Sequence, residues 1–210
     1  MTSEERREIR YQRRKAKRDE ARLKRSMACG DFDEVFSFRH LYLSAKKCCK
    51  GVYWKSSTQR YIGDLIPNVA LTLLSLKNGT FIHRGFHEFY IMERGKKRHI
   101  RSVHISERTV QKCLCDYCIV PIYSASFIYD NSASLKHRGM DFALRRMVYH
   151  LERHFRKHGL SGGILIYDFK SFFDDAPHAP LLREAERRLH DDRVRELHNS
   201  FIADFGPVGL

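Results

Sequence analysis

The residues whose types and spacing suggest chemistry lie in one stretch, residues 162–178, with the sequence GGILIYDFKSFFDDAPH. Its apolar run at residues 164–167 is short and rich in strand-forming residues, which predicts a buried strand. Asp168 follows that run directly. A carboxylate at the end of a core strand on a basic chain indicates a Mg²⁺ ligand for phosphoryl chemistry, because such sites combine one or two carboxylates with substrate phosphates. The alternative is an aspartate that only caps the turn after a strand.

The string DFKSFFD at residues 168–174, followed by His178 and two leucines, resembles the first catalytic motif of reverse transcriptases. The likeness is greatest to the bacterial, phage and group II intron-like enzymes. It implies that Asp168 is a catalytic residue that binds both Mg²⁺ ions of a palm domain, and that the backbone carbonyl of Phe169 joins it as a metal ligand. It also implies that Phe173 packs under the sugar of the incoming nucleotide. Because a ring there would clash with a ribose 2′-hydroxyl, Phe173 favours a deoxynucleotide substrate.

A second part of the resemblance is the run RGKKRHIRSVHISERTVQ at residues 94–111, which is similar to the fingers segment of the same polymerases. The resemblance implies that Arg98, in a hairpin, and Arg108, in the following helix, hold the triphosphate of the incoming nucleotide. Arginine suits that role because its planar fork meets phosphate oxygens with two hydrogen bonds and keeps its charge. The alternative is two surface arginines on a basic hairpin.

Residues 121–139 resemble the family segment that crosses from fingers to palm, and they end in the basic loop Lys136-His137-Arg138. The resemblance implies that Lys136 and Arg138 bind phosphates of template or primer. The matching region spans residues 64–210, and it lacks the pair of adjacent aspartates that completes the metal site in the family. The chain is therefore expected to be inactive alone. It is either a portion of a longer polymerase, the favoured interpretation, or a truncated product that binds without polymerising.

Composition restricts the partners. The chain has 210 residues, 42% of them hydrophobic, and a formal net charge of +14. That charge favours a polyanionic partner, and no apolar run approaches the roughly 18 to 20 residues of a membrane span. With no apolar signal region at the N-terminus we expect a cytoplasmic protein without a membrane partner, whose six cysteines are thiols. Cys115-x-x-Cys118 alone is a weak zinc signal, because no second pair follows it at the spacing of a zinc finger.

The helices and strands expected from the sequence predict an α+β fold. By the resemblance, this fold is a helix-rich fragment of a polymerase, made of the fingers with their β-hairpin and of the first palm strand. The hairpin is expected from strands at 86–92 and 100–105 joined by a charged turn. Helices are expected at 31–50, at 64–77 with Asp64 as its cap, from Ser106 to a stop before Pro121, at 140–158 and at two places after 176. Residues 54–63 read as a loop, and residues 1–27 as a solvated helix with eleven basic against five acidic residues.

Two further expectations concern the helix at 140–158 and the division of the chain. Leu144, Val148, Leu151 and Phe155 recur at helical spacing, which predicts a stripe facing a core. The predicted regions are a basic extension at 1–30, a fingers-like region at 31–160 and an incomplete palm at 161–210.

The main functional hypothesis is an RNA-directed DNA polymerase that uses Mg²⁺, an RNA template, a DNA or RNA primer and deoxynucleoside triphosphates. The alternative is a non-catalytic basic protein that binds RNA or DNA, with affinity dominated by phosphate contacts. A third hypothesis is a basic scaffold for an acidic protein. The sequence assigns no oligomeric state and does not identify the natural template.

Overall fold

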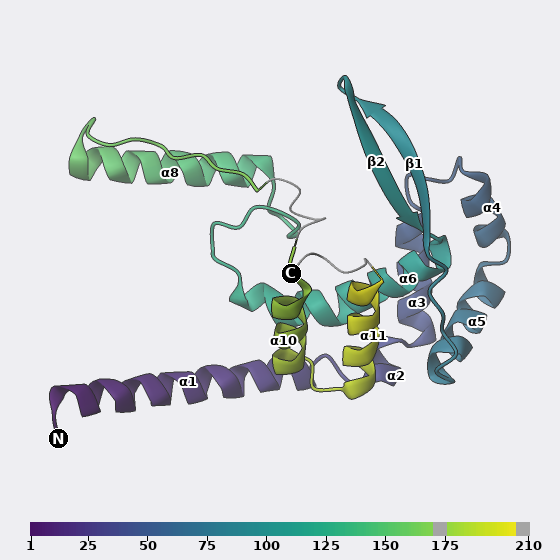
Figure 1. Ribbon diagram of the computed structural model, residues 1–210, viewed down its shortest axis with the longest axis horizontal. Helices are drawn as coiled ribbons and strands as arrows, with labels where there is room; N and C mark the ends of the chain where they lie inside the picture. Colours follow the sequence, from purple (N-terminus) through teal and green to yellow (C-terminus); the bar gives the residue numbers. More distant parts are fainter. Residues whose placement is uncertain (170–175, 205–210) are drawn as a thin grey trace. The chain divides into compact units, whose positions relative to one another are not determined.

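The computed structural model describes residues 1–169 and 176–204. The chain divides into two compact units, one formed by Met1–Ile122 with Pro177–Leu210, and the other by Tyr123–Ala176. Within the described residues the structure is helix-rich α+β with one antiparallel hairpin, which confirms the coarse fold class (Figure 1). The predicted regions with boundaries at 30 and 160 stay a prediction.

The core of the first unit is formed where α3 (Phe38–Cys49) packs against α5 (Leu65–Lys77) and α6 (Ile105–Leu114). Apolar side chains from these helices and the adjoining segments are fully buried: Phe36, Leu41, Val69, Val110 and Cys113. Burial of each aliphatic or aromatic side chain contributes roughly 1.5 to 3 kcal/mol. The same unit also contains α2 (Phe32–Val35), α10 (His178–Arg188) and α11 (Asp192–Ala203).

The N-terminal helix α1 (Ser3–Met27) is exposed along most of its length, as the sparse apolar residues of the segment predict. A capping box starts it, in which the Thr2 hydroxyl accepts from the backbone N–H of Glu5 and the Glu5 carboxylate accepts from that of Thr2. Its last turn is anchored, because the buried Ser26 hydroxyl accepts a hydrogen bond of 3.1 Å from the backbone N–H of His190.

The hairpin pairs β1 (Phe86–Glu93) with β2 (Lys96–Val103) in antiparallel register, from Phe86 opposite Val103 to Glu93 opposite Lys96. Its two-residue turn is Arg94-Gly95, both with positive φ (50° and 76°), as the right-handed twist of a tight hairpin requires. The predicted hairpin is thus confirmed, although β2 spans Lys96–Val103 and not residues 100–105, so the turn is shorter than predicted. The cap of α6 was predicted wrongly: His104, not Ser106, is the N-cap, and it accepts from the backbone N–H of Ser106.

Three local predictions in the first unit are wrong. Residues 54–63 are not a loop throughout, because α4 (Ser56–Gly63) forms there and buries Thr58 and Tyr61. The helix after the hairpin does not stop before Pro121 but continues through a π-helical turn, η1 (Cys115–Ile119), into α7 (Val120–Tyr123). Pro121 lacks the N–H that would continue a regular helix, and it directly follows the π-helical turn, where the regular hydrogen-bond pattern is already interrupted. The predicted capping by Asp64 is also absent, since the side chain of Asp64 makes no cap hydrogen bond to α5.

The second unit consists of a short 3₁₀ turn, η2 (Ser124–Ser126), a loop, the helix α8 (Met140–His158) and an extended segment. Asp130 in the loop pairs with Arg146 and with His150 of α8, the latter at 2.7 Å. After Gly159 (φ 64°) the chain turns back, and the Nε2 atom of His154 lies 2.7 Å from the carbonyl oxygen of Ser161.

Two predictions in this unit are wrong for the described residues. The stripe on α8 does not face a core, because none of its residues is buried and Phe155 is 58% exposed. Residues 164–167 form no strand and are 69 to 88% exposed. A strand requires a neighbour to accept and donate its backbone hydrogen bonds, and the described part of the unit offers no such neighbour.

The cysteines and the helices agree with two expectations from composition. All six cysteines are free thiols. Among the described helices, none has the length and apolar character needed to cross a membrane.

Candidate nucleic-acid interface

Asp168, the predicted metal ligand, lies in the extended segment that follows α8. Its side chain is exposed and forms no ion pair with any residue that the structure describes. One carboxylate oxygen, Oδ1, accepts the backbone N–H of Phe169 at 2.9 Å. The Phe169 side chain is 67% exposed. The local geometry therefore leaves the second carboxylate oxygen of Asp168 accessible to a cation.

The other predicted residues of the second unit differ in their surroundings. Phe173 lies outside the described residues, as do the neighbouring Asp174 and Asp175. Lys136 is exposed. The Arg138 guanidinium instead donates within the loop, to the carbonyl oxygens of Tyr129 (2.6 Å) and Asn131 (3.0 Å). These hydrogen bonds give Arg138 a role in holding the loop before α8.

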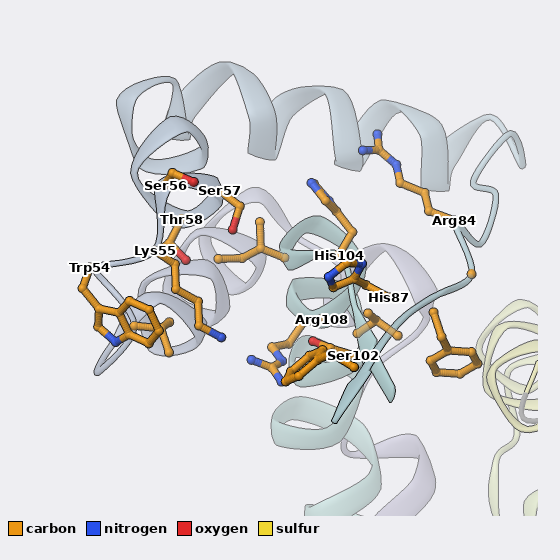
Figure 2. A pocket seen from close by; sticks show the side chains of 16 residues that line it. Trp54, Lys55, Ser56, Ser57, Thr58, Arg84, His87, Ser102, His104 and Arg108 are labelled. Atoms are coloured by element: carbon orange, nitrogen blue, oxygen red, sulfur yellow. The ribbon is translucent and has the colours of Figure 1, made fainter. Parts of the chain in front are cut away.

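Arg108, the predicted triphosphate ligand of α6, lines a cleft of about 1030 Å³ in the first unit (Figure 2). The cleft is enclosed by the start of α4, the base of the hairpin and the first turn of α6. Its sixteen lining residues include no aspartate or glutamate. The basic residues that line it are Lys55, Arg84, His87, His104 and Arg108.

The permanent cations of the cleft have no anionic partner within the described part of the chain. Lys55, Arg84 and Arg108 make no ion pair there, and Figure 2 shows Lys55 and Arg108 pointing toward one another from opposite walls. Partial burial and the positive charge of Arg84 hold the pKa of His104 below its usual value, although Glu107 opposes this. An anion in the cleft would relieve the mutual repulsion of these groups.

The start of α4 adds a second feature suited to anions. Lys55 is the N-cap residue of this helix and makes no side-chain cap hydrogen bond, and Ser56, Ser57 and Thr58 of the first turn line the cleft. The first N–H groups of a helix lack partners within the helix and carry a partial positive charge, which favours phosphate.

An exposed aromatic side chain lies at the same end of the cleft. Trp54 is 76% exposed, and the ammonium of Lys55 lies 5.3 Å from the centre of its ring. Aromatic surfaces beside basic grooves bind nucleic-acid bases by stacking. The cleft thus combines cations, helix N–H groups and an aromatic face, the three features that recognise the phosphates and bases of a single strand.

Arg98, the other predicted triphosphate ligand, does not line this cleft. It lies opposite Ile91 in the hairpin and pairs with Glu93 at 2.6 Å. Ile100, whose partner Phe89 lines the cleft, stands two residues further along the strand, which corresponds to about 7 Å. The described structure therefore places Arg108 in a cleft without acidic lining residues and Arg98 on the distal half of the hairpin.

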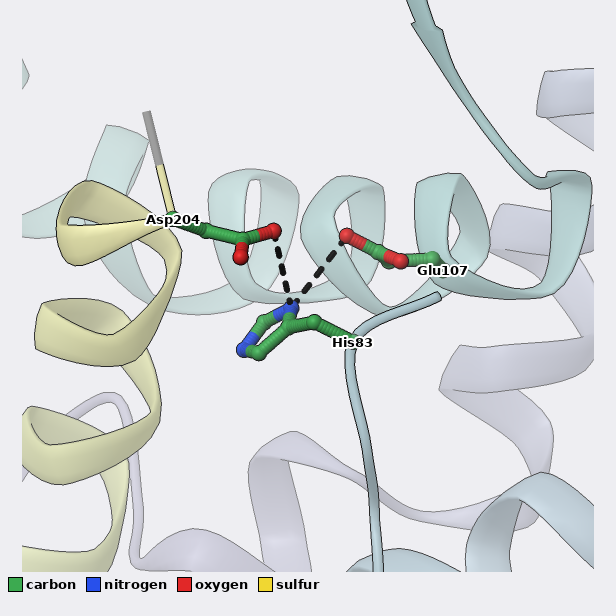
Figure 3. Close-up of side chains that lie close together, drawn as sticks. All are labelled: His83, Glu107 and Asp204. Carbon is green, nitrogen blue, oxygen red and sulfur yellow. Dashed lines mark hydrogen bonds and ion pairs between the residues drawn. The ribbon is translucent and has the colours of Figure 1, made fainter. Parts of the chain in front are cut away.

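A third cluster contains metal-ligating side chains. His83, Glu107 and Asp204 come from the segment before β1, from α6 and from the end of α11, and their ligand atoms lie within 4.8 Å of one another (Figure 3). Among the described residues this is the one group of three or more histidine, cysteine or acidic side chains close enough to share an ion. Cys115 and Cys118 take part in no such group.

The sequence reasoning missed most of these residues, and only some carried a signal. The interleaved aromatic and basic residues of 81–89, FIHRGFHEF, are typical of nucleic-acid binding surfaces and could have identified Arg84 and His87. Trp54-Lys55 stood in a segment read as a polar loop. The spacing of His83, Glu107 and Asp204 carries no local signature, since only the fold brings these three together.

Comparison of the chain with protein-family models and with curated proteins finds no match. The resemblance to reverse transcriptases therefore depends on the motifs quoted above. The geometry of the cleft is an independent observation, and it concerns binding of anions.

Proposed function

We propose that this protein is an RNA-directed DNA polymerase whose first unit binds phosphates in the cleft between α4, the hairpin and α6. The observation that carries the proposal is the acid-free cleft, in which Arg108 is joined by Lys55 and by the uncapped start of α4. The resemblance of residues 168–174 to the first catalytic motif of reverse transcriptases supports the catalytic part of the proposal. The reaction would be attack of a primer 3′-hydroxyl on the α-phosphorus of a deoxynucleoside triphosphate.

In this reaction the residues of the chain bind and position. Arg108 and Lys55 would neutralise phosphate oxygens, which stabilises the charge that develops during nucleotidyl transfer. Asp168 would hold Mg²⁺ through its exposed carboxylate, with the carbonyl of Phe169 beside it. This donor set fits Mg²⁺, because magnesium prefers oxygen ligands and takes few of them from the protein. Phe173 would exclude the ribose 2′-hydroxyl.

The second candidate is a nucleic-acid-binding protein without polymerase chemistry. It is supported by the cleft itself and by the exposed basic helix α1, because both provide phosphate contacts without requiring a metal site. Binding alone does not distinguish the two candidates. The two candidates differ in whether the Asp168 carboxylate is needed for primer extension.

The test is the Asp168→Asn substitution in protein that extends a primer on an RNA template with Mg²⁺. We expect primer extension to be lost while the dissociation constant for the RNA stays within a few-fold of the original, because the carboxylate contacts ions and not the strand. Retention of full extension by the variant would remove Asp168 from the metal site. Because this chain alone is expected to be inactive, the second candidate would be supported only if a longer protein that contains this chain and the missing pair of aspartates binds RNA but extends no primer with intact Asp168.

A further inference from the structure

The side chains of His83, Glu107 and Asp204 raise a problem of buried charge. The Glu107 side chain is 2% exposed, His83 is 18% exposed and Asp204 is 30% exposed. One Glu107 oxygen accepts from the backbone N–H of Arg84 (3.2 Å), and the other lies 3.2 Å from Nδ1 of the His83 ring. The Oδ2 atom of Asp204 is buried and accepts no hydrogen bond from the described residues. A buried carboxylate oxygen without a partner is costly.

Ser200 fixes the protonation of the other side of the His83 ring. The Ser200 hydroxyl donates its proton to the carbonyl oxygen of Leu197 at 2.8 Å. Because that proton is used, the 2.9 Å contact between Ser200 Oγ and His83 Nε2 requires Nε2 to be the donor. In a neutral ring the lone pair of Nδ1 then faces the carboxylates of Glu107 and Asp204, an arrangement that calls for a cation between them.

A proton on Nδ1 of His83 would compensate only one of the two carboxylates. It can be donated to Glu107 at 3.2 Å, but Asp204 Oδ2 lies 3.8 Å from Nδ1, beyond hydrogen-bond distance. A divalent ion would bind Nδ1 and both carboxylates and would balance their two negative charges. Two ligands of one zinc ion lie roughly 3.4 Å apart at tetrahedral angles. The three ligand atoms here lie within 4.8 Å of one another, so an approach of at most roughly 1.4 Å by the Asp204 carboxylate would complete the set.

We infer that His83, Glu107 and Asp204 form a binding site for a divalent transition-metal ion, with zinc as the best match. One imidazole and two carboxylates suit zinc, whereas magnesium and calcium prefer oxygen ligands alone. Ser200 is the outer partner that orients the histidine, as is usual for metal-bound imidazole. The ion would join the segment before β1, α6 and the end of α11, and this inference does not depend on the proposed polymerase function.

The test measures binding of Zn²⁺ and of Co²⁺ to the full chain after removal of metals with a chelator. We expect one ion per chain and a Co²⁺ spectrum without a thiolate charge-transfer band, which separates this site from the six cysteines. Asp204→Asn should weaken binding by at least tenfold, and Ser200→Ala, which leaves all three ligands in place, by about 10- to 100-fold. The melting temperature of the original chain should rise with zinc concentration.

The matched control is His99→Gln, which removes an exposed histidine that pairs with Glu88 at 3.1 Å on the hairpin. This variant should bind the ion as the original chain does. Absence of stoichiometric binding in the original chain would overturn the inference, and so would equal affinity in the Asp204→Asn variant. If a variant fails to fold by circular dichroism, the Co²⁺ spectrum of the original chain still decides, because a thiolate band would place the ion at cysteines.

Discussion

The Arg108→Gln substitution tests whether the cleft binds nucleic-acid phosphates. Three permanent cations line the cleft without an ion-pair partner among the described residues: Lys55, Arg84 and Arg108. Each phosphate contact to a single strand contributes about −0.7 to the slope of log Kobs against log salt concentration. If all three cations make contacts, the cleft contributes a slope of about −2.1, and loss of Arg108 reduces it to about −1.4.

These slopes convert into affinities that an assay resolves. Between 50 and 200 mM salt, three contacts weaken binding by about 18-fold and two contacts by about 7-fold. The measurement is fluorescence anisotropy of a labelled single-stranded oligonucleotide at five or more salt concentrations. Phosphate contacts made elsewhere, including those of α1, add the same amount to the slopes of the original chain and of the Arg108→Gln variant. They therefore cancel in the difference between the two slopes.

Arg98→Gln is the matched control for Arg108→Gln, because it removes the same charge from a site outside the cleft. Arg98 is already paired with Glu93, and the oligonucleotide carries no triphosphate for it to bind. We expect the slope of this variant to remain near the original. An equal change of slope in both variants would show that net charge alone governs binding. An unchanged slope in Arg108→Gln would remove Arg108 from the interface.

The remaining predictions concern substrate choice, thiol reactivity and pH. In primer extension, Phe173→Ala should raise ribonucleotide incorporation relative to deoxynucleotide incorporation by roughly 5- to 150-fold, since overlap in a packed site costs ~1 to 3 kcal/mol. An unchanged ratio of the two incorporation efficiencies in a folded variant would make Phe173 an ordinary core residue. Burial raises the pKa of Cys113 to about 12. Alkylation of Cys113 at pH 8, followed by mass spectrometry, should therefore be about a thousandfold slower than alkylation of a thiol with a pKa of 9. Comparable rates would contradict the burial of Cys113. Burial raises the pKa of Asp116, but hydrogen bonds from two lysines outweigh this and hold it below its usual value. The ionised carboxylate therefore stabilises the fold above its unfolded-state pKa, and this stabilisation is lost as pH falls through the lower folded-state pKa. Asp116→Asn should lower the free energy of unfolding by ~1 to 3 kcal/mol at pH 7, and in acid denaturation curves this difference from the original chain should disappear. A difference in the free energy of unfolding that does not change with pH would exclude the ionic contribution.

Local patterns predicted the elements whose stability is local. The hairpin follows from alternating residues on either side of Arg94-Gly95, and α11 follows from Asp191, whose carboxylate accepts from the backbone N–H of Val194. The helix α4 was missed because its sequence, SSTQRYIG, is mostly polar, and the packing of Thr58 and Tyr61 in the structure shows that it has a buried face. Its stability depends on tertiary contacts that composition does not reveal.

Patterns that depend on a distant partner were predicted less well. The run at residues 164–167 has the composition of a buried strand, but strand formation depends on a neighbouring strand that periodicity cannot supply. The stripe on α8 identified the apolar face correctly without revealing that this face is exposed in the described structure. The motif singled out Arg108 but not Lys55 and Trp54, which line the same cleft and come from a segment some fifty residues earlier.

Two pairs of consecutive residues link the cleft to the buried cluster. His83 and Glu107 face inward, while their neighbours Arg84 and Arg108 line the cleft (Figures 2 and 3). A selection experiment that randomised the cleft would therefore act on the interior as well, since any backbone shift that accommodates a new residue at position 84 or 108 moves a buried ligand. Variants with altered binding should carry a cost in folding yield, and second-site suppressors should arise at Ser200 or Asp204 on α11, far from the substituted residues in the chain.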